Sequence, residues 1–113
     1  MKTHELRFPP DAKRLDLATE LFRALSDPTR VALLLALREG EWSVGDLVEA
    51  LGRPQSTVSR HLAALRQAEL VDTRRDAAKV YYRIVSPHVL ELLAQAFSHA
   101  DHVAGGIPHE HDR

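Results

Sequence analysis

A run of short polar and cationic side chains between residues 55 and 65 has the types and spacing needed to contact DNA. Val58, Leu62 and Leu65 recur at i, i+4 and i+7, so on a helix they form one apolar stripe. On or beside the opposite stripe lie Ser56, Ser59, Arg60 and Ala63. Hydroxyl and guanidinium groups can hydrogen-bond to base edges and phosphates. The pattern predicts a recognition helix that buries one face and offers the other to DNA.

A second group with chemical potential is a set of histidines on the last predicted helix, His88, His99 and His102. Imidazole nitrogens without thiolates suit Zn(II), Co(II) or Ni(II). His88 and His99 face the same way on a helix but are separated by about 16 Å along its axis, so one helix cannot bring both to one ion. Antiparallel pairing with a symmetry mate would place His88 of one subunit against His99 and His102 of the other. The alternative is that these are solvated or core-edge histidines in a polar C-terminus.

Two further histidines, His109 and His111, follow a Gly-Gly-Ile-Pro connection at residues 105–108. They could fold back as additional metal ligands, or they could belong to a disordered polar tail. Four ligands would favour tetrahedral Zn(II), whereas five or six would favour Ni(II) or Co(II). His4, near the N-terminus, is a weaker candidate of the same kind.

The composition restricts the class of protein. The chain has 113 residues, a formal net charge of -1 and no cysteine, so disulfides and thiolate metal sites are excluded. The basic residues are concentrated: Arg53 to Arg83 holds seven of them against three acidic residues, a local charge of +4. That concentration favours a nucleic-acid partner. Without a long apolar run or the apolar core of a signal peptide, we expect one cytosolic domain and no membrane partner.

Turn and cap signals predict the elements that position these groups. Ser43 can cap a short helix that ends at Gly52, and Pro54 begins the next helix, which is helix-turn-helix spacing. Two strand-like runs follow and predict a hairpin, the wing. Its cations are placed where they could straddle an adjacent phosphate backbone of DNA: Arg74, Arg75, Lys79 and Arg83. The other predicted elements are helices from Asp11 to about Leu25, from Asp27-Pro28 to Gly40 and from Pro87 to about His102, and strands Val71 to Arg75 and Lys79 to Val85, separated by Asp76-Ala77-Ala78.

These elements predict a mainly α fold with a small β-hairpin, a winged helix-turn-helix. We expect a flexible arm at residues 1–10, the folded domain at 11–102 and a histidine-containing flexible tail at 103–113. The last helix is apolar around more than half its circumference, which predicts a homodimer formed through the first and last helices. Two recognition helices roughly 34 Å apart would read an inverted repeat.

The chain resembles the ArsR/SmtB family of transcriptional repressors from about Leu17 to His102. The resemblance is carried by LFRALSDPTRVALLLAL, by SVGDLVEALGRPQSTVSRHLAALRQAELVDTRRDAAKVYYRIV and by the three histidines of the last helix. The DNA-contacting positions it implies are Gln55, Ser56, Ser59 and Arg60, with Thr57 as a flanking candidate. His61 lies nearer the buried stripe and is expected to be a packed or a phosphate-side residue, not a base reader. Arg30 is expected to be structural.

The same resemblance bears on the metal. The family's Cys-x-Cys site is absent, because Ser43 and Gly45 occupy those positions. His88, His99 and His102 match the other site, at the paired last helices, but its aspartate position is Ser86. A neutral hydroxyl binds divalent ions weakly, so water, His109 or His111 would complete the ligand set. Nickel- and cobalt-sensing members carry a histidine-bearing C-terminal extension. His111 lies nine residues past His102, much as the distal ligand of those members does.

The resemblance implies a repressor whose metal-free dimer holds the operator of an efflux or resistance gene and releases it when Ni(II), Co(II) or Zn(II) binds. One alternative is a family member that has lost metal sensing. A histidine-tailed metal buffer is another, and a small metallohydrolase using His99 and His102 is a third. The enzyme is disfavoured, because the chain lacks a nucleophile or carboxylate constellation.

Overall fold

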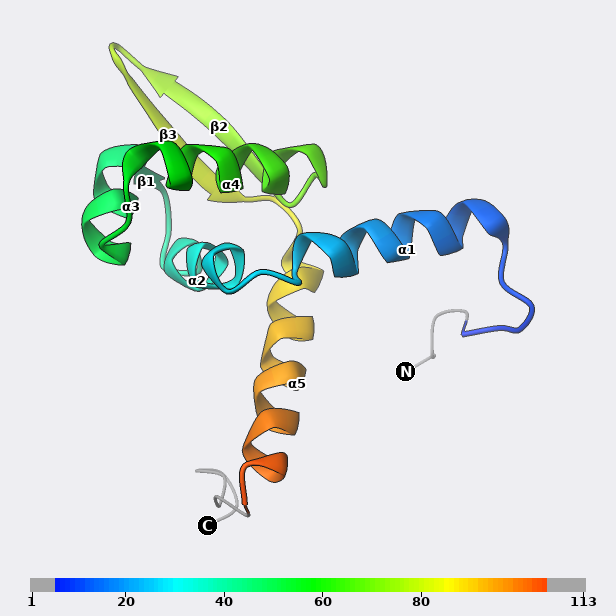
Figure 1. The fold of residues 1–113 in the computed structure, drawn as a ribbon. Coiled ribbons are helices and arrows are strands. Elements are labelled where there is room, and N and C mark those ends of the chain that lie inside the picture. The colour runs from blue at the N-terminus through cyan, green and yellow to red at the C-terminus, as the bar shows by residue number, and fades with distance from the viewer. Residues whose placement is uncertain (1–5, 106–113) are drawn as a thin grey trace.

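The computed structural model describes residues 6–105, so His4, His109 and His111 lie outside the described residues. Figure 1 shows a central body from which two helices project in different directions. The helices are α1 (Ala12–Ala24), α2 (Pro28–Leu37), α3 (Val44–Leu51), α4 (Gln55–Gln67) and α5 (Pro87–Val103), and the strands are β1 (Trp42–Ser43), β2 (Val71–Asp76) and β3 (Lys79–Ile84). The predicted helices are all present, and α5 extends one residue past His102.

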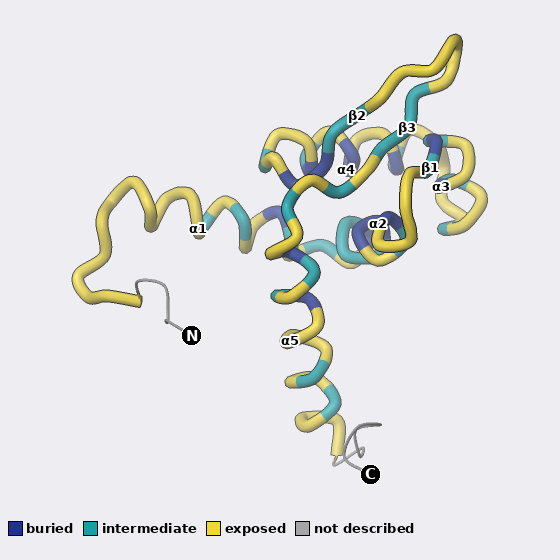
Figure 2. The backbone as a smooth tube through the Cα atoms, turned by 180° about the vertical axis from the view of Figure 1, so that it is seen from behind, coloured by how far each residue is buried: buried dark blue, intermediate teal, exposed yellow. Residues whose placement is uncertain are grey.

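The core lies where α2, α3 and α4 meet the sheet (Figure 2). The apolar stripe predicted for α4 is confirmed, because Val58, Leu62 and Leu65 have no exposed surface. Leu33, Leu34 and Leu47 from the neighbouring helices are equally buried. Each such side chain contributes about 1.5–3 kcal/mol by leaving water, so this contact fixes how α4 sits on the body.

Local capping explains where the helix-turn-helix begins and turns. The Ser43 hydroxyl accepts from the backbone N–H of Asp46, and the Asp46 carboxylate accepts from the N–H of Ser43. This reciprocal pair satisfies two otherwise unpaired donors at the start of α3. Gly52 ends α3 in the left-handed region, at φ 65°, where a side chain would be strained. Pro54 then precedes the first residue of α4.

The sheet has one strand more than the sequence predicted. Its order is β1-β3-β2, with both pairs antiparallel. β2 and β3 form the predicted hairpin, but Asp76 pairs with Lys79, so the turn is only Ala77-Ala78. In β1, Trp42 pairs with Tyr82 and Ser43 with Tyr81. A strand of two residues is too short to produce an alternating pattern, so sequence reasoning missed it.

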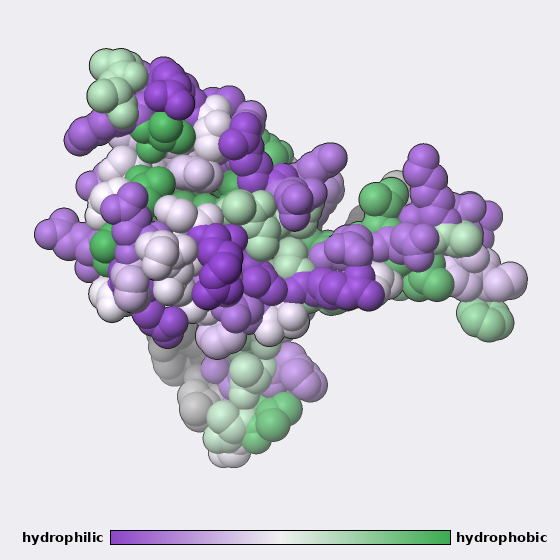
Figure 3. All heavy atoms as spheres, turned by 45° about the horizontal axis from the view of Figure 1, so that its top comes forward, coloured by the Kyte–Doolittle hydropathy of each residue, from purple (hydrophilic) through white to green (hydrophobic). Residues whose placement is uncertain are grey.

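The two projecting helices expose apolar side chains. Ala24 is the only buried residue of α1, and α5 buries only Val89 and Leu93. Phe22 and Phe97, in contrast, are 60% and 48% exposed, and Figure 3 shows hydrophobic surface on both projections. No helix in residues 6–105 is both long and apolar enough to cross a membrane.

Candidate nucleic-acid interface

The polar face of α4 is presented to solvent. Gln55, Ser56, Ser59 and Arg60 are exposed, so these four predicted contact residues share the accessible side of the helix, and the flanking candidate Thr57 is half-buried. Pro54 provides no side-chain hydrogen bond to the first turn. Unpaired N–H groups and the helix dipole favour an anion such as a phosphate at that end. The face therefore combines hydrogen-bonding groups, a cation and a positive helix end.

Polar contacts supplement the apolar packing behind this face. The His61 side chain is buried, with 6% of the residue exposed, and its Nδ1 lies 3.1 Å from a guanidinium nitrogen of Arg30. Arg53, just before α4, donates to the Thr29 hydroxyl at 2.9 Å. The burial of His61 agrees with its expected packing role. The start and the middle of α4 are thus both tied to the beginning of α2.

The wing cations differ in how they are held. Arg74 donates from Nε to a Glu41 carboxylate oxygen at 2.9 Å, and its guanidinium carbon lies 4.9 Å from the centre of the Tyr81 ring. Arg83 is 3.7 Å from the other Glu41 oxygen. Arg75 and Lys79 are exposed near the hairpin turn, and neither forms an ion pair within the part of the chain that is described. The cations available to a phosphate are therefore at the tip.

The Glu41–Arg74 pair is ionised on both sides. The hydrogen bond from Arg74 lowers the pKa of the Glu41 carboxyl, against a smaller opposing effect of burial. The same bond raises the pKa of the Arg74 guanidinium. Because Glu41 precedes β1 and Arg74 lies on β2, the pair fastens the far strand of the wing to the body. Arg74 is consequently both a wing anchor and a cation that is already partly compensated.

The predicted metal ligands are exposed on α5 but are not brought together. His88, His99 and His102 are all accessible. Among residues 6–105, no three His, Cys, Asp or Glu side chains lie close enough to hold an ion. Ser86 precedes α5, and its side chain makes no capping hydrogen bond, so its hydroxyl is not committed to the helix. Three imidazoles suit a borderline divalent cation, and the set needs ligands from elsewhere to close a site.

Sequence reasoning missed two groups that position the interface. One is Glu41, whose contact with the wing depends on the strand register and leaves no mark in a local pattern. The other is the set of contacts made by Asp27 and Arg30. The sequence correctly predicts Asp27 and Pro28 at the start of α2. The hydrogen bond between Arg30 and His61, which lie 31 positions apart, could not be predicted from local sequence spacing.

Comparison with known proteins agrees with this geometry. Residues 27–73 match the model of the arsR family of bacterial regulatory proteins. The transcriptional regulator KmtR of Mycobacterium tuberculosis is 46% identical over 95 residues, covering 84% of this chain and 73% of the relative. The regulator NmtR of the same organism is 35% identical over 103 residues, covering 91% of this chain and 86% of the relative.

The fold has solved counterparts as well. The homodimeric winged helix-turn-helix DNA-binding domain of a Mycobacterium bovis protein superposes with a TM-score of 0.78 at 31% identity, covering 97% of this chain and 99% of that structure. The predicted winged helix-turn-helix is therefore confirmed. By sequence and by fold, the chain belongs to the arsR family of bacterial regulatory proteins.

Proposed function

We propose that this protein is a homodimeric transcriptional repressor that binds an inverted-repeat operator and releases it when a divalent cation binds. The observation that carries the DNA-binding part is the two-sided character of α4. One side is fully buried through Val58, Leu62 and Leu65, and the other exposes the predicted contact residues. Membership in a family of regulatory proteins removes the support for the enzyme alternative.

The basic wing complements α4. The β2–β3 hairpin, which carries Arg75 and Lys79, extends beyond the body (Figure 1). These two cations could straddle a phosphate backbone while α4 lies in the major groove. Arg74 and Arg83 are shared with Glu41, so their contribution to phosphate binding is reduced. The protein acts where the bacterial chromosome lies, and we therefore place it in the cytoplasm.

A homodimer is supported by the apolar faces left open on α1 and α5. Leu17, Phe22 and Phe97 are exposed to an extent that a solvated helix does not require. The Mycobacterium bovis relative is itself a homodimer. A twofold dimer would cover these faces and carry two recognition helices to one side.

The metal response rests on His88, His99 and His102 and on the resemblance described above. All three side chains are accessible on α5, and pairing α5 with its symmetry mate would join His88 of one protomer to the other two histidines of its partner. A cation bound there would crosslink imidazoles of both protomers and hold the helices in one relative orientation. Nickel, cobalt and zinc are all compatible with these donors.

A second candidate within the same class is an operator-binding repressor without metal sensing. Ser86 favours it, because a neutral serine replaces the charged ligand that the resemblance implies at this position. The two candidates share the DNA-binding surface and differ only in whether a cation changes operator affinity.

Removing the cation of the recognition face should weaken DNA binding. Arg60→Ala should weaken binding by about 10- to 100-fold, because one base or phosphate contact by arginine is worth about 1–3 kcal/mol. The measurement is fluorescence anisotropy at fixed salt, on a duplex that the protein enriches from a random-sequence library. Arg66→Ala is the matched control, since Arg66 is exposed on the same helix but lies in its last turn, about 9 Å further along the axis than Arg60. Equal losses for the two variants would contradict the assignment.

A metal site that is shared across the dimer can be recognised by subunit exchange. His88→Ala and His99→Ala should each lose high-affinity Co(II) binding, followed by the cobalt absorption spectrum, while metal-free DNA binding is unchanged. After subunit exchange, a mixed dimer has one intact site, built from His88 of one chain and His99 and His102 of the other. Mixing the two variants should therefore restore one ion per mixed dimer.

The control for this exchange mixes His88→Ala with His88→Gln, which lack the same ligand, and should restore nothing. Retention of tight Co(II) binding by either single variant would contradict the shared site, as would a mixture no better than its components. Binding of Co(II) without any change in operator affinity would favour the second candidate.

A further inference from the structure

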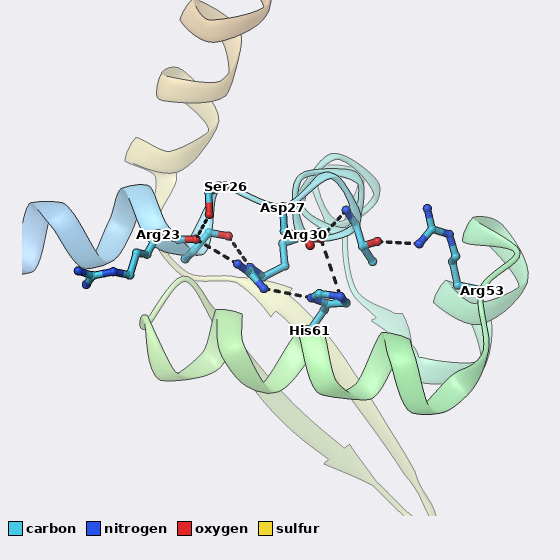
Figure 4. A network of polar contacts seen from close by, with 8 residues as sticks. Arg23, Ser26, Asp27, Arg30, Arg53 and His61 are labelled. Carbon is cyan, nitrogen blue, oxygen red and sulfur yellow. Dashed lines mark hydrogen bonds and ion pairs between the residues drawn. The ribbon is translucent and has the colours of Figure 1, made fainter.

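Arg30 links the end of α1 to the recognition helix through three hydrogen bonds. Its Nε donates to the carbonyl of Ala24 at 2.7 Å, and Nη2 donates to the carbonyl of Arg23 at 3.0 Å. Its remaining amino group, Nη1, faces Nδ1 of His61 at 3.1 Å. Figure 4 shows the guanidinium between the last turn of α1 and the His61 ring on α4. Because arginine has donors only, the ring nitrogen accepts, which leaves the ring proton on Nε2.

Asp27 completes the arrangement. Its Oδ1 accepts from the backbone N–H of Thr29 at 2.8 Å and of Arg30 at 3.3 Å, and it lies 3.8 Å from Nε2 of His61. Burial acts to raise the pKa of Asp27, but the two backbone hydrogen bonds and the nearby His61 and Arg30 lower it overall. The carboxylate is therefore charged and faces the protonated nitrogen of the ring. We call Asp27, Arg30, His61 and the two α1 carbonyls the joint.

Apart from these hydrogen bonds, α1 makes little buried contact with the body. Ala24 is its only buried residue, and Leu21 and Leu25 pack against the core only in part. The rest of α1 extends away from the body in both views (Figures 1 and 2). Hydrogen bonds to the charged Arg30 are stronger than neutral ones. The joint therefore supplies a large part of what fixes the direction of α1 relative to α4.

The joint also borders the side of the body where α5 begins. Ala24, Arg30 and His88 line one hollow of about 810 Å³ between α1, α4 and α5. A change in how α1 and α5 pair in a dimer would therefore alter the surroundings of Arg30.

We propose that Arg30 and His61 are positioning residues that set the angle between α1 and the recognition helix α4. The orientation of α1 in the dimer would then determine the orientation of the DNA-contacting face of α4. This inference rests on the proposed function for its consequence, operator binding. The joint itself lies within one protomer and can be tested without DNA or metal.

A pH dependence follows from the joint. Burial lowers the pKa of His61, assisted by Arg60, Arg30 and Arg53 and opposed by Asp27. The unfolded chain therefore takes up this proton at a higher pH than the folded chain, so the stabilisation is complete above about pH 6.5 and is lost as the pH falls through the lowered pKa. The Tm of the wild type should fall more between pH 7.5 and 5.5 than that of His61→Asn. Equal falls would contradict a buried, neutral His61.

The decisive variants are His61→Leu and His61→Asn. Leucine keeps most of the volume and removes the acceptor for Arg30, whereas asparagine offers an oxygen near the position of Nδ1. The chain has no cysteine, so Lys13→Cys on α1 and Ala63→Cys on α4, both exposed, can be spin-labelled cleanly. Double electron–electron resonance of labelled protein diluted into unlabelled protein then measures the α1–α4 distance within one protomer.

We expect a narrow distance distribution for the labelled parent and for His61→Asn, and a broader one for His61→Leu. Thr29→Val is the matched control, because it removes the Arg53 contact that ties α4 to α2 and leaves the link to α1 intact; it should stay narrow. A narrow distribution in His61→Leu, or equal broadening in Thr29→Val, would overturn the joint.

A functional measurement complements the distance. His61→Leu should bind the enriched duplex roughly tenfold more weakly, with an unchanged dependence on salt, because no phosphate contact is lost. A shallower salt dependence would instead identify His61 as a phosphate contact and overturn the positioning role. If the parent itself failed to bind DNA, the proposed function would fall, whereas the distance measurement would still decide the joint.

Discussion

The burial of one stripe of α4 is the constraint on which the other features depend. Val58, Leu62 and Leu65 have no contact with solvent, so α4 cannot rotate about its axis without exposing apolar surface. A rotation that exposed one of them would cost about 1.5–3 kcal/mol. The same constraint keeps Ser56, Ser59 and Arg60 outside. The chemistry of the outer face is therefore determined by the packing of the inner one.

Charged side chains then orient the elements around α4. Glu41 holds Arg74 and so ties β2 to the start of β1, while Arg30 ties the end of α1 to His61. Arg74 and Arg30 thus each join elements that are distant in sequence. Neither arginine lies at the tip of the wing. The cations at the wing tip, Arg75 and Lys79, are left for phosphates. Positioning and binding are thus assigned to different arginines.

The fold was largely predictable because its signals are local. Asp27 with Pro28 begins α2, Ser43 caps α3, and Gly52 ends it, and each residue acts on its own neighbours in the chain. The stripe of α4 was predicted from its 3.6-residue period. β1 was not, since two residues carry no period and pair only because β3 passes beside them.

The site was less predictable than the fold. Exposure of the α4 face follows from periodicity, but the Glu41–Arg74 and Arg30–His61 contacts join residues 33 and 31 positions apart, and only the folded chain brings them together. The ligand role of His88, His99 and His102 depends on a second protomer, so no arrangement within one chain can confirm it.

The most direct test of the two-sided α4 is to titrate ¹⁵N-labelled protein with the enriched duplex and map amide chemical-shift changes. We expect the largest changes on Gln55 to Arg60 and around the wing turn at Ala77 and Ala78. Changes confined to α1 or α5, with α4 unaffected at saturating DNA, would contradict this expectation.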